Sequence, residues 1–490
     1  MFENLHRGAG ITGEMRNFNS VGIDIGSTTT QLVFSRLTLG FVEEKHKYDI
    51  VEREVTQFSE ISLTPFDDSY NIEIDGLSKI ISAAYKGAGY SAEDIDTGAI
   101  IITGVAALRH NGERILNLFT GSMGRFVCAT AGPNLEAILA AHGSGAVELS
   151  ERSLKTVMNV DVGGGTTKIA VVRNGEILDT ASIYVGARHV VINDEGRALR
   201  IEEPAKILAA TQGFDLKLDQ IISEEKKRQM ASTLADCLFQ VVSNSGLSPL
   251  TERLMQTPPL SFKEKPDIVV FSGGVSEYIY GYESQSFGDL GIILGEEIRR
   301  RLHELDTTVV EPAERIRATV IGESQYTLQI SGSTNLISSP KLLPMRNLPV
   351  VAPHFYSSAL SQEEIEEELK RVIEMHDLDI ALDPFALAFR RSVISQPSYQ
   401  LMKKLSEAVI AVLGGKVKVG DTVILVFEAD IGMGIGRVIK EEVAPGLNLI
   451  SIDEVKLGDF NYIDIDEPRG SRGFIPVIVK SLIFPKQVIS

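Results

Sequence analysis

Two stretches of the sequence decide the fold. The first, Gly22–Thr30, reads GIDIGSTTT, and the second, Asn159–Thr167, reads NVDVGGGTT. Each combines an apolar strand that ends in aspartate, a turn of small residues, and a second strand with alternating apolar side chains. Alternation over a short run predicts half-buried strands, and glycines with small polar residues predict the tight turn that joins them. The sequence therefore predicts a duplicated β-hairpin and, with it, two related α/β lobes.

The two turns have the composition of a phosphate-binding site. Phosphate oxygens need main-chain N–H donors at close range, and glycine permits that approach because it has no Cβ. An aspartate at a strand end can hold magnesium through water, so we expect Asp24 and Asp161 to do so. One such turn alone is more often an ordinary hairpin, whereas two copies favour a site. The expected phosphate contacts are Gly26, Ser27, Thr28, Thr29, Gly163, Gly164, Gly165, Thr166 and Thr167.

A third glycine-rich turn follows a predicted strand at Asp267–Phe271. The ordered triple resembles the superfamily of actin, hexokinase and the heat-shock chaperone ATPases, in which two phosphate hairpins face each other across a cleft. The resemblance implies that Gly273, Gly274 and Val275 contact the adenosine of ATP. It also implies that Glu136 orients the attacking water, with Asp161 as the second catalytic residue; a solvated helical glutamate is the alternative. No P-loop motif and no dinucleotide-binding fingerprint occurs in the chain.

Within this superfamily the chain is similar to the EutA family, the reactivating factors of ethanolamine ammonia-lyase. The resemblance extends over essentially the whole chain. The stretches that carry it are Val21–Thr30, Cys128–Gly145, Phe271–Gly281, Ala318–Gly332, Ser451–Phe460 and Val477–Phe484, of which the last three are the specific ones. It implies a chaperone-like, weakly ATP-hydrolysing protein that uses ATP and magnesium. Such a protein frees damaged cobalamin from the lyase so that intact adenosylcobalamin can enter; the lyase is its protein partner, and cobalamin is handled through it.

Composition limits the other classes of function. Hydrophobic residues make up 43% of the chain and charged residues 23%, as in folded globular proteins. The formal net charge of −18 disfavours binding to nucleic acid or to an anionic membrane. With no apolar run long enough to cross a bilayer and no signal peptide, we expect a cytoplasmic protein; association with an ethanolamine microcompartment stays open. Cys128 and Cys237 are isolated and predicted to be plain core residues, so a cysteine-ligated cluster is poorly supported.

The order of predicted elements gives a domain plan. We expect an N-terminal leader (1–20), a first actin-like lobe (21–155), a second lobe (156–340) and a C-terminal α/β domain (341–490). Predicted helices include Leu77–Lys86, one started by Pro133, a long one over Lys217–Val242, one capped by Ser361 with Glu364 completing a capping box, and Tyr399–Leu413. Ser338–Pro353 is predicted to be a linker. Gly432–Gly436 is predicted to be a structural strand-to-helix turn; a turn that a ligand approaches closely is the alternative.

Three other functions use the same fold. A small-molecule kinase needs an acid beside an acceptor hydroxyl, and no sugar-kinase signature assigns one. An activase that passes electrons to a dehydratase needs cluster ligands that two isolated cysteines do not supply. A nucleotide-binding scaffold or filament protein is the third alternative. The sequence does not give the oligomeric state.

Overall fold

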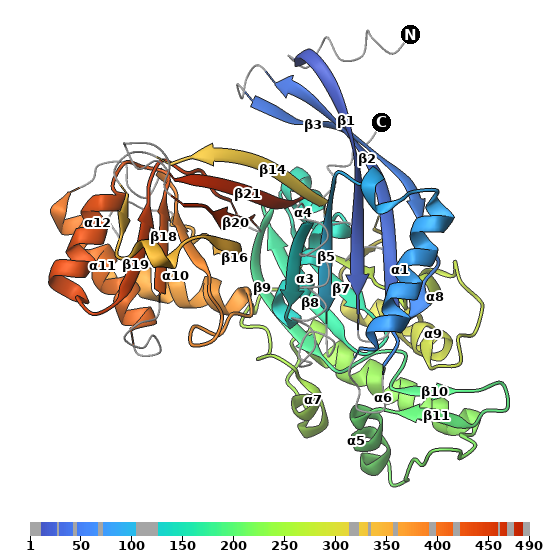
Figure 1. Ribbon diagram of the computed structural model, residues 1–490. Coiled ribbons are helices and arrows are strands. Elements are labelled where there is room, and N and C mark those ends of the chain that lie inside the picture. Colours follow the sequence, from blue (N-terminus) through green and yellow to red (C-terminus); the bar gives the residue numbers. More distant parts are fainter. Residues whose placement is uncertain are drawn as a thin grey trace. The chain divides into compact units, whose positions relative to one another are not determined.

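The computed structural model describes residues 11–26, 29–42, 47–66, 72–103, 126–312, 323–331, 335–355, 361–391, 398–414, 422–458, 461–467 and 475–483. The chain forms two compact units, unit 1 up to Gly322 and unit 2 over Glu323–Ile483 (Figure 1). No helix of the described ranges is both long and apolar enough to cross a membrane.

Unit 1 contains two sheets with the same strand order and directions. The first has the order β3-β2-β1-β5-β6; the pairs β3-β2 and β2-β1 are antiparallel, and the pairs β1-β5 and β5-β6 are parallel. The second has the order β9-β8-β7-β12-β13 and repeats these directions. The strands of the first sheet are β1 (Ile11–Ile25), β2 (Thr29–Val42), β3 (Lys47–Phe58), β5 (Thr97–Thr103) and β6 (Phe126–Ala131), with β4 (Ser62–Leu63) paired to β2. Those of the second are β7 (Thr156–Val162), β8 (Thr167–Arg173), β9 (Glu176–Ile183), β12 (Ile268–Ser272) and β13 (Thr308–Val310). The predicted duplication, and the two-lobed α/β fold class that depends on it, are confirmed.

Helices cover both faces of the second sheet, and its central strand β7 is therefore buried along its whole length. On one face, α3 packs against β7, β8 and β9, and α4 joins it. On the other face, Met158, Val160 and Val162 enter a large apolar core with α6 and α9. The helices of unit 1 are α1 (Ile74–Ala88), α3 (Pro133–Gly143), α4 (Ala146–Ser153), α5 (Glu203–Thr211), α6 (Glu224–Val242), α7 (Pro249–Leu254), α8 (Ser276–Tyr280) and α9 (Gly291–Arg301). A separate ribbon of β10 (Val190–Ile192) and β11 (Ala198–Ile201) follows β9 (Figure 1).

The long helix of unit 1 starts later than predicted. Ser223 is its N-cap, and its hydroxyl accepts a hydrogen bond from the Lys226 N–H. The residues before it pair with the β10–β11 ribbon instead, because Ile221 bridges to Arg197. A local Ser cap and a nearby strand edge therefore outcompete helix propensity over Lys217–Ile222.

Unit 2 is built on an eight-stranded sheet of order β14-β21-β20-β16-β17-β18-β19-β15. Its strands are β14 (Glu323–Ile330), β15 (Leu336–Ile337), β16 (Met345–Val351), β17 (Ala386–Phe389), β18 (Thr422–Phe427), β19 (Asn448–Ile452), β20 (Asn461–Ile465) and β21 (Pro476–Ile483). Its helices are α10 (Gln362–Met375), α11 (Tyr399–Leu413) and α12 (Gly432–Val438). The capping box at Ser361 and Glu364 and the helix Tyr399–Leu413 are confirmed.

The predicted linker was wrong. Ser338–Pro353 contains β16, which lies inside the sheet between β20 and β17 and buries Leu348, Val350 and Val351. Its prolines made the stretch look like a connection, but burial against two neighbouring strands decides the structure. Strand β14 belongs to unit 2, so the structure divides the chain before the predicted boundary at residue 341. The four-part domain plan itself stays a prediction.

Candidate functional site

The second hairpin places Asp161 on the α3 face of its sheet. The carboxylate is 7% exposed and accepts a 2.8 Å hydrogen bond from the Ser272 hydroxyl on β12. Burial raises the pKa of Asp161, while the Lys168 ammonium and the bond from Ser272 oppose that rise. Asn159, two residues earlier on the same face, accepts a hydrogen bond from the Ser144 hydroxyl at 2.8 Å. A chain of buried polar side chains therefore runs beneath α3 and ends at Asp161.

The turn that follows is held from outside through its carbonyl groups. Ala187 N–H donates to the Gly163 carbonyl at 3.1 Å, and Arg188 N–H donates to the Gly164 carbonyl at 2.6 Å. Within the described part of the chain, the N–H groups of Gly164 and Gly165 donate no hydrogen bond. With carbonyls engaged and N–H groups available, the turn has the donor set that a phosphate needs.

The predicted threonines of this turn differ in what they can offer. The Thr167 hydroxyl is fully buried and donates to the Val185 carbonyl at 2.8 Å. Thr166 is 9% exposed, directly after the half-buried glycines. A phosphate contact through the Thr167 hydroxyl would therefore require breaking an internal hydrogen bond.

The turn predicted to contact adenosine lies beside Asp161. Gly273 has a φ of +84°, and a Cβ built on it would lie 2.6 Å from the Val162 carbonyl oxygen and 2.9 Å from Asp161 Oδ1. Val275 N–H donates to the Val162 carbonyl at 3.0 Å, and the Ser276 hydroxyl closes the turn on the Gly273 carbonyl at 2.7 Å. Only glycine combines this conformation with this close approach. Gly274 lies in the same turn, half-buried.

The first hairpin has the same backbone design. Asp24 is half-buried on β1, and the turn closes through a 2.9 Å bond from Gly26 N–H to the Thr29 carbonyl. The Thr64 hydroxyl donates to the Gly26 carbonyl at 2.7 Å, so this turn too is held through a carbonyl. Ser27 and Thr28 lie outside the described residues.

Glu136 is not the solvated side chain of the alternative interpretation. It lies in the first turn of α3, 4% exposed, and its Oε2 forms an ion pair with Lys168 Nζ on β8. Lys168 was missed from the sequence because a lone lysine on a strand looks like a surface residue. The sequence did contain a signal, which is the matching position of Lys168 and Gln31 in the two hairpins. Lys168 follows Asp161 at the same spacing at which Gln31 follows Asp24.

Arg188 is a second residue that the sequence did not single out. Its ion pair with Asp289 is long, 3.7 Å, and its Nε is buried without a hydrogen-bond partner among the described residues. Burial lowers the pKa of Arg188, and Asp289 opposes that shift. The Arg188 backbone holds the Gly164 carbonyl, while its guanidinium is directed to Asp289.

These residues fit a magnesium-bound polyphosphate. The second hairpin turn offers the N–H groups of Gly164 and Gly165, Asp24 and Asp161 offer carboxylate oxygens, and the buried Asn159 Nδ2 has no partner in the described structure. In the described ranges no three histidine, cysteine or acidic side chains cluster as metal ligands. Magnesium is usually held by one or two carboxylates together with water and phosphate oxygens. Cys237 is buried in α6, as predicted, and the side chain of Cys128 lies outside the described residues.

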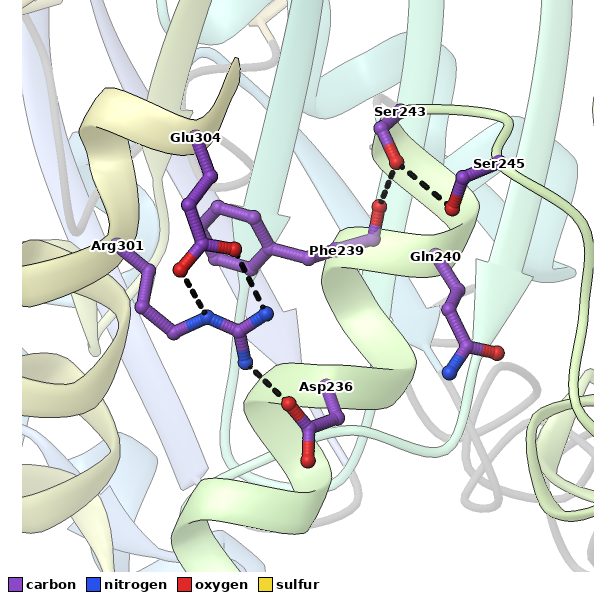
Figure 2. Close-up of a pocket in the computed structure, with 7 residues that line it drawn as sticks. All are labelled: Asp236, Phe239, Gln240, Ser243, Ser245, Arg301 and Glu304. Atoms are coloured by element: carbon purple, nitrogen blue, oxygen red, sulfur yellow. Dashed lines mark hydrogen bonds and ion pairs between the residues drawn. The ribbon is translucent and has the colours of Figure 1, made fainter.

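A pocket elsewhere in unit 1 has different chemistry. Figure 2 shows this polar pocket, which is lined by residues at the end of α6 and just after it and by residues at the end of α9 and just after it. Its volume is about 250 Å³. Arg301 pairs with Asp236 at 2.5 Å and with Glu304 at 2.9 Å, and its guanidinium lies over the Phe239 ring. Two carboxylates already balance that single cation, so the pocket offers no net positive charge to a phosphate. None of the predicted site residues lines it.

Together the duplicated sheets and the aspartate-ended hairpins define a two-lobed α/β protein of the actin-like class. The model of one family, Ethanolamine utilisation protein EutA, matches residues 16–485. The ethanolamine ammonia-lyase reactivase EutA of Salmonella typhimurium is 33% identical over 476 residues, which cover 96% of this chain and 99% of that protein. The protein of the same name from Escherichia coli is 33% identical over 482 residues, with the same coverage. The chain belongs to the EutA family.

Among solved structures, a Ppx/GppA family protein of Aquifex aeolicus is similar with a TM-score of 0.37 and 15% identity. The similar region covers 62% of this chain and 96% of the Aquifex aeolicus protein. A score this low supports no argument about the site.

Proposed function

We propose that this protein is an ATP-dependent reactivating factor of adenosylcobalamin-dependent ethanolamine ammonia-lyase. The observation that carries the proposal is full-length similarity to two proteins named as reactivases of that lyase, over 96% of this chain and 99% of theirs. The similarity extends through unit 2, which lies beyond the hairpins that many nucleotide-binding proteins share. The activity therefore belongs to the whole chain, acting in the cytoplasm on a protein partner.

ATP and magnesium are the proposed cofactors. Asp24 and Asp161 would hold the ion, the two glycine-rich turns would bind phosphate oxygens, and the turn Gly273–Val275 would contact adenosine. Magnesium, when bound, supplies positive charge that neutralises the phosphates. Glu136 remains the candidate for orienting water, but its carboxylate is shared with Lys168, which limits how far it can move. We expect slow ATP hydrolysis, which suits a conformational switch better than a metabolic kinase.

The nucleotide can drive a partner only by binding one arrangement of the protein better than another. Contacts from two separate hairpins allow this, since each belongs to its own sheet within unit 1. ATP would favour one arrangement, hydrolysis would remove the preference, and the lyase would respond by releasing damaged cobalamin. Cobalamin itself is handled through the lyase in this proposal.

A reactivation assay tests the proposal. Ethanolamine ammonia-lyase that holds damaged cobalamin is incubated with this protein, ATP, magnesium and adenosylcobalamin, and ethanolamine turnover is followed. We expect restored turnover with the wild-type chain and at least about a tenfold loss with Asp161→Asn, since removing a charged partner in a buried site costs several kcal/mol. Asp215→Asn, which removes an exposed carboxylate, is the matched control and should restore turnover fully. No restoration by correctly folded wild-type protein would reject the proposal, and ATP consumption stimulated by one small metabolite would favour a kinase.

A further inference from the structure

Lys168 lies at the centre of the second hairpin's charged groups. Its register partner across the β7–β8 ladder is Asp161, so both side chains are on the α3 face of the sheet. Its Nζ forms the ion pair with Glu136 of α3, and the two side chains are 14% and 5% exposed. Two buried carboxylates and one ammonium leave the cluster with a net charge of −1 when all are ionised.

The ammonium has more donors than this pair uses. A lysine ammonium carries three N–H bonds, and Glu136 accepts one of them. No second acceptor for Lys168 is found in the described part of the chain. The side chain is therefore able to keep its pair with Glu136 and donate to another anion at the same time. Burial makes such a charge-assisted bond stronger than it would be in water.

The strand order indicates which part of a nucleotide Lys168 would meet. The turn predicted to contact adenosine follows β12, Asp161 lies next to the last residue of β7, and Lys168 lies on β8, with β7 between β12 and β8. Neighbouring strands lie about 4.8 Å apart, so Lys168 lies roughly 10 Å along the sheet from β12. Lys168 thus lies on the side of Asp161 that faces away from the turn Gly273–Val275, which is predicted to contact adenosine. An anion there is the phosphate furthest from adenosine.

We propose that Lys168 binds the terminal phosphate and gives the site its preference for ATP over ADP. The inference rests on the proposed ATP-dependent function and names the residue that distinguishes the two nucleotides. The first hairpin supplies the comparison, because Gln31 occupies the matching register position opposite Asp24. Lys168→Gln therefore converts the second hairpin to the side chain that the first already has.

The test measures ATP and ADP binding to the full-length chain by equilibrium dialysis in the presence of magnesium. Wild-type protein should prefer ATP, and Lys168→Gln should weaken ATP binding about 10- to 100-fold, the usual range for a bond between charged groups. ADP binding should change by less than about threefold, because ADP lacks the phosphate that the lysine contacts. An unchanged ratio of ATP to ADP affinity would overturn the inference while leaving the proposed function intact.

A purely structural role for Lys168 is separated by a double variant. Lys168→Gln alone removes the cation that pairs with the buried Glu136 carboxylate, which is destabilising. Lys168→Gln combined with Glu136→Gln removes both charges, and thermal unfolding followed by circular dichroism should show most of the stability restored. The preference for ATP should stay lost in that folded double variant. If stability and preference return together, Lys168 is only a counter-ion; if wild-type protein binds neither nucleotide, the inference and the proposed function both fail.

Discussion

Replacing Gly273 with alanine should destabilise unit 1 more than the same substitution at another glycine of similar backbone conformation. Gly273 has a φ of +84°, and Gly246 has a φ of +93°. A Cβ at Gly246 would meet nothing within 4 Å, whereas one at Gly273 would lie 2.6 Å from the Val162 carbonyl oxygen. The two sites share the conformational cost and differ in the steric one.

The magnitudes follow from these two costs. Left-handed backbone costs an alanine about 1–2 kcal/mol, and the stiffer unfolded chain returns roughly 0.5–1 kcal/mol. Gly246→Ala should therefore cost about 1 kcal/mol or less. At Gly273 the new methyl group must also displace the β7 backbone or the Asp161 carboxylate, and overpacking of this kind costs about 1–3 kcal/mol. The total for Gly273→Ala is then roughly 1–4 kcal/mol.

Urea unfolding followed by far-ultraviolet circular dichroism measures the difference, because the chain has no tryptophan to report by fluorescence. Hydrogen exchange of peptides from β7 and β12 assigns the transition to unit 1, since a chain of two units need not unfold in one step. If both variants lose the same free energy of unfolding within about 0.5 kcal/mol, the close approach of Gly273 to Asp161 is not what fixes this turn.

Two further predictions concern other parts of the chain. Burial lowers the pKa of His189 to about 4, and nearby Arg200 adds to that effect. In the unfolded chain the histidine titrates near 6.5, so below that pH the unfolded state binds a proton that the folded state does not. The free energy of unfolding should therefore be unaffected by His189 above pH 6.5 and should fall by up to roughly 3 kcal/mol as the pH decreases toward 4. His189→Gln, which can keep the bond to the Tyr184 carbonyl, should flatten this part of the pH profile of urea midpoints, and an unchanged profile would contradict the assignment. Ser361→Ala should remove the cap that accepts the Glu364 N–H at 3.2 Å and cost unit 2 about 1 kcal/mol, seen as faster hydrogen exchange in the first turn of α10; equal exchange rates in the two proteins would refute it.

Turns, helix caps and hairpins could be predicted from the sequence because residues close together in the chain determine them. The capping box at Ser361 forms as the spacing predicts. The two hairpins were found because a glycine-rich turn between apolar strands has a strong local pattern. The glycines of Gly432–Gly436 lie within α12 itself, where Gly432 packs against the backbone of Ile452 and Asp453, which supports the structural interpretation.

What the sequence could not supply was contact between distant segments. β16 is a central strand because β20 and β17 flank it, and neither neighbour is close to it in the chain. Ser272 and Glu136 reach the second hairpin from a parallel strand and from a covering helix, so no spacing rule connects them to Asp161 or Lys168. The predicted helix at α6 began too early, because Ile221, just before the N-cap Ser223, pairs with Arg197 in a β-bridge.

The duplicated hairpins agree in backbone and differ in charge, and the difference bears on how one nucleotide could use both. Opposite Asp24 lies Gln31, a neutral and buried side chain that brings no charge to this register position. Opposite Asp161 lies Lys168, whose charge already acts on the carboxylate and whose ammonium is held by Glu136. The second hairpin therefore offers an anion an ammonium donor that Gln31 does not provide at the first, while each hairpin keeps an aspartate for a cation. Two copies of one motif that bound the same group would not need this asymmetry, whereas a magnesium polyphosphate, which carries both charges, does.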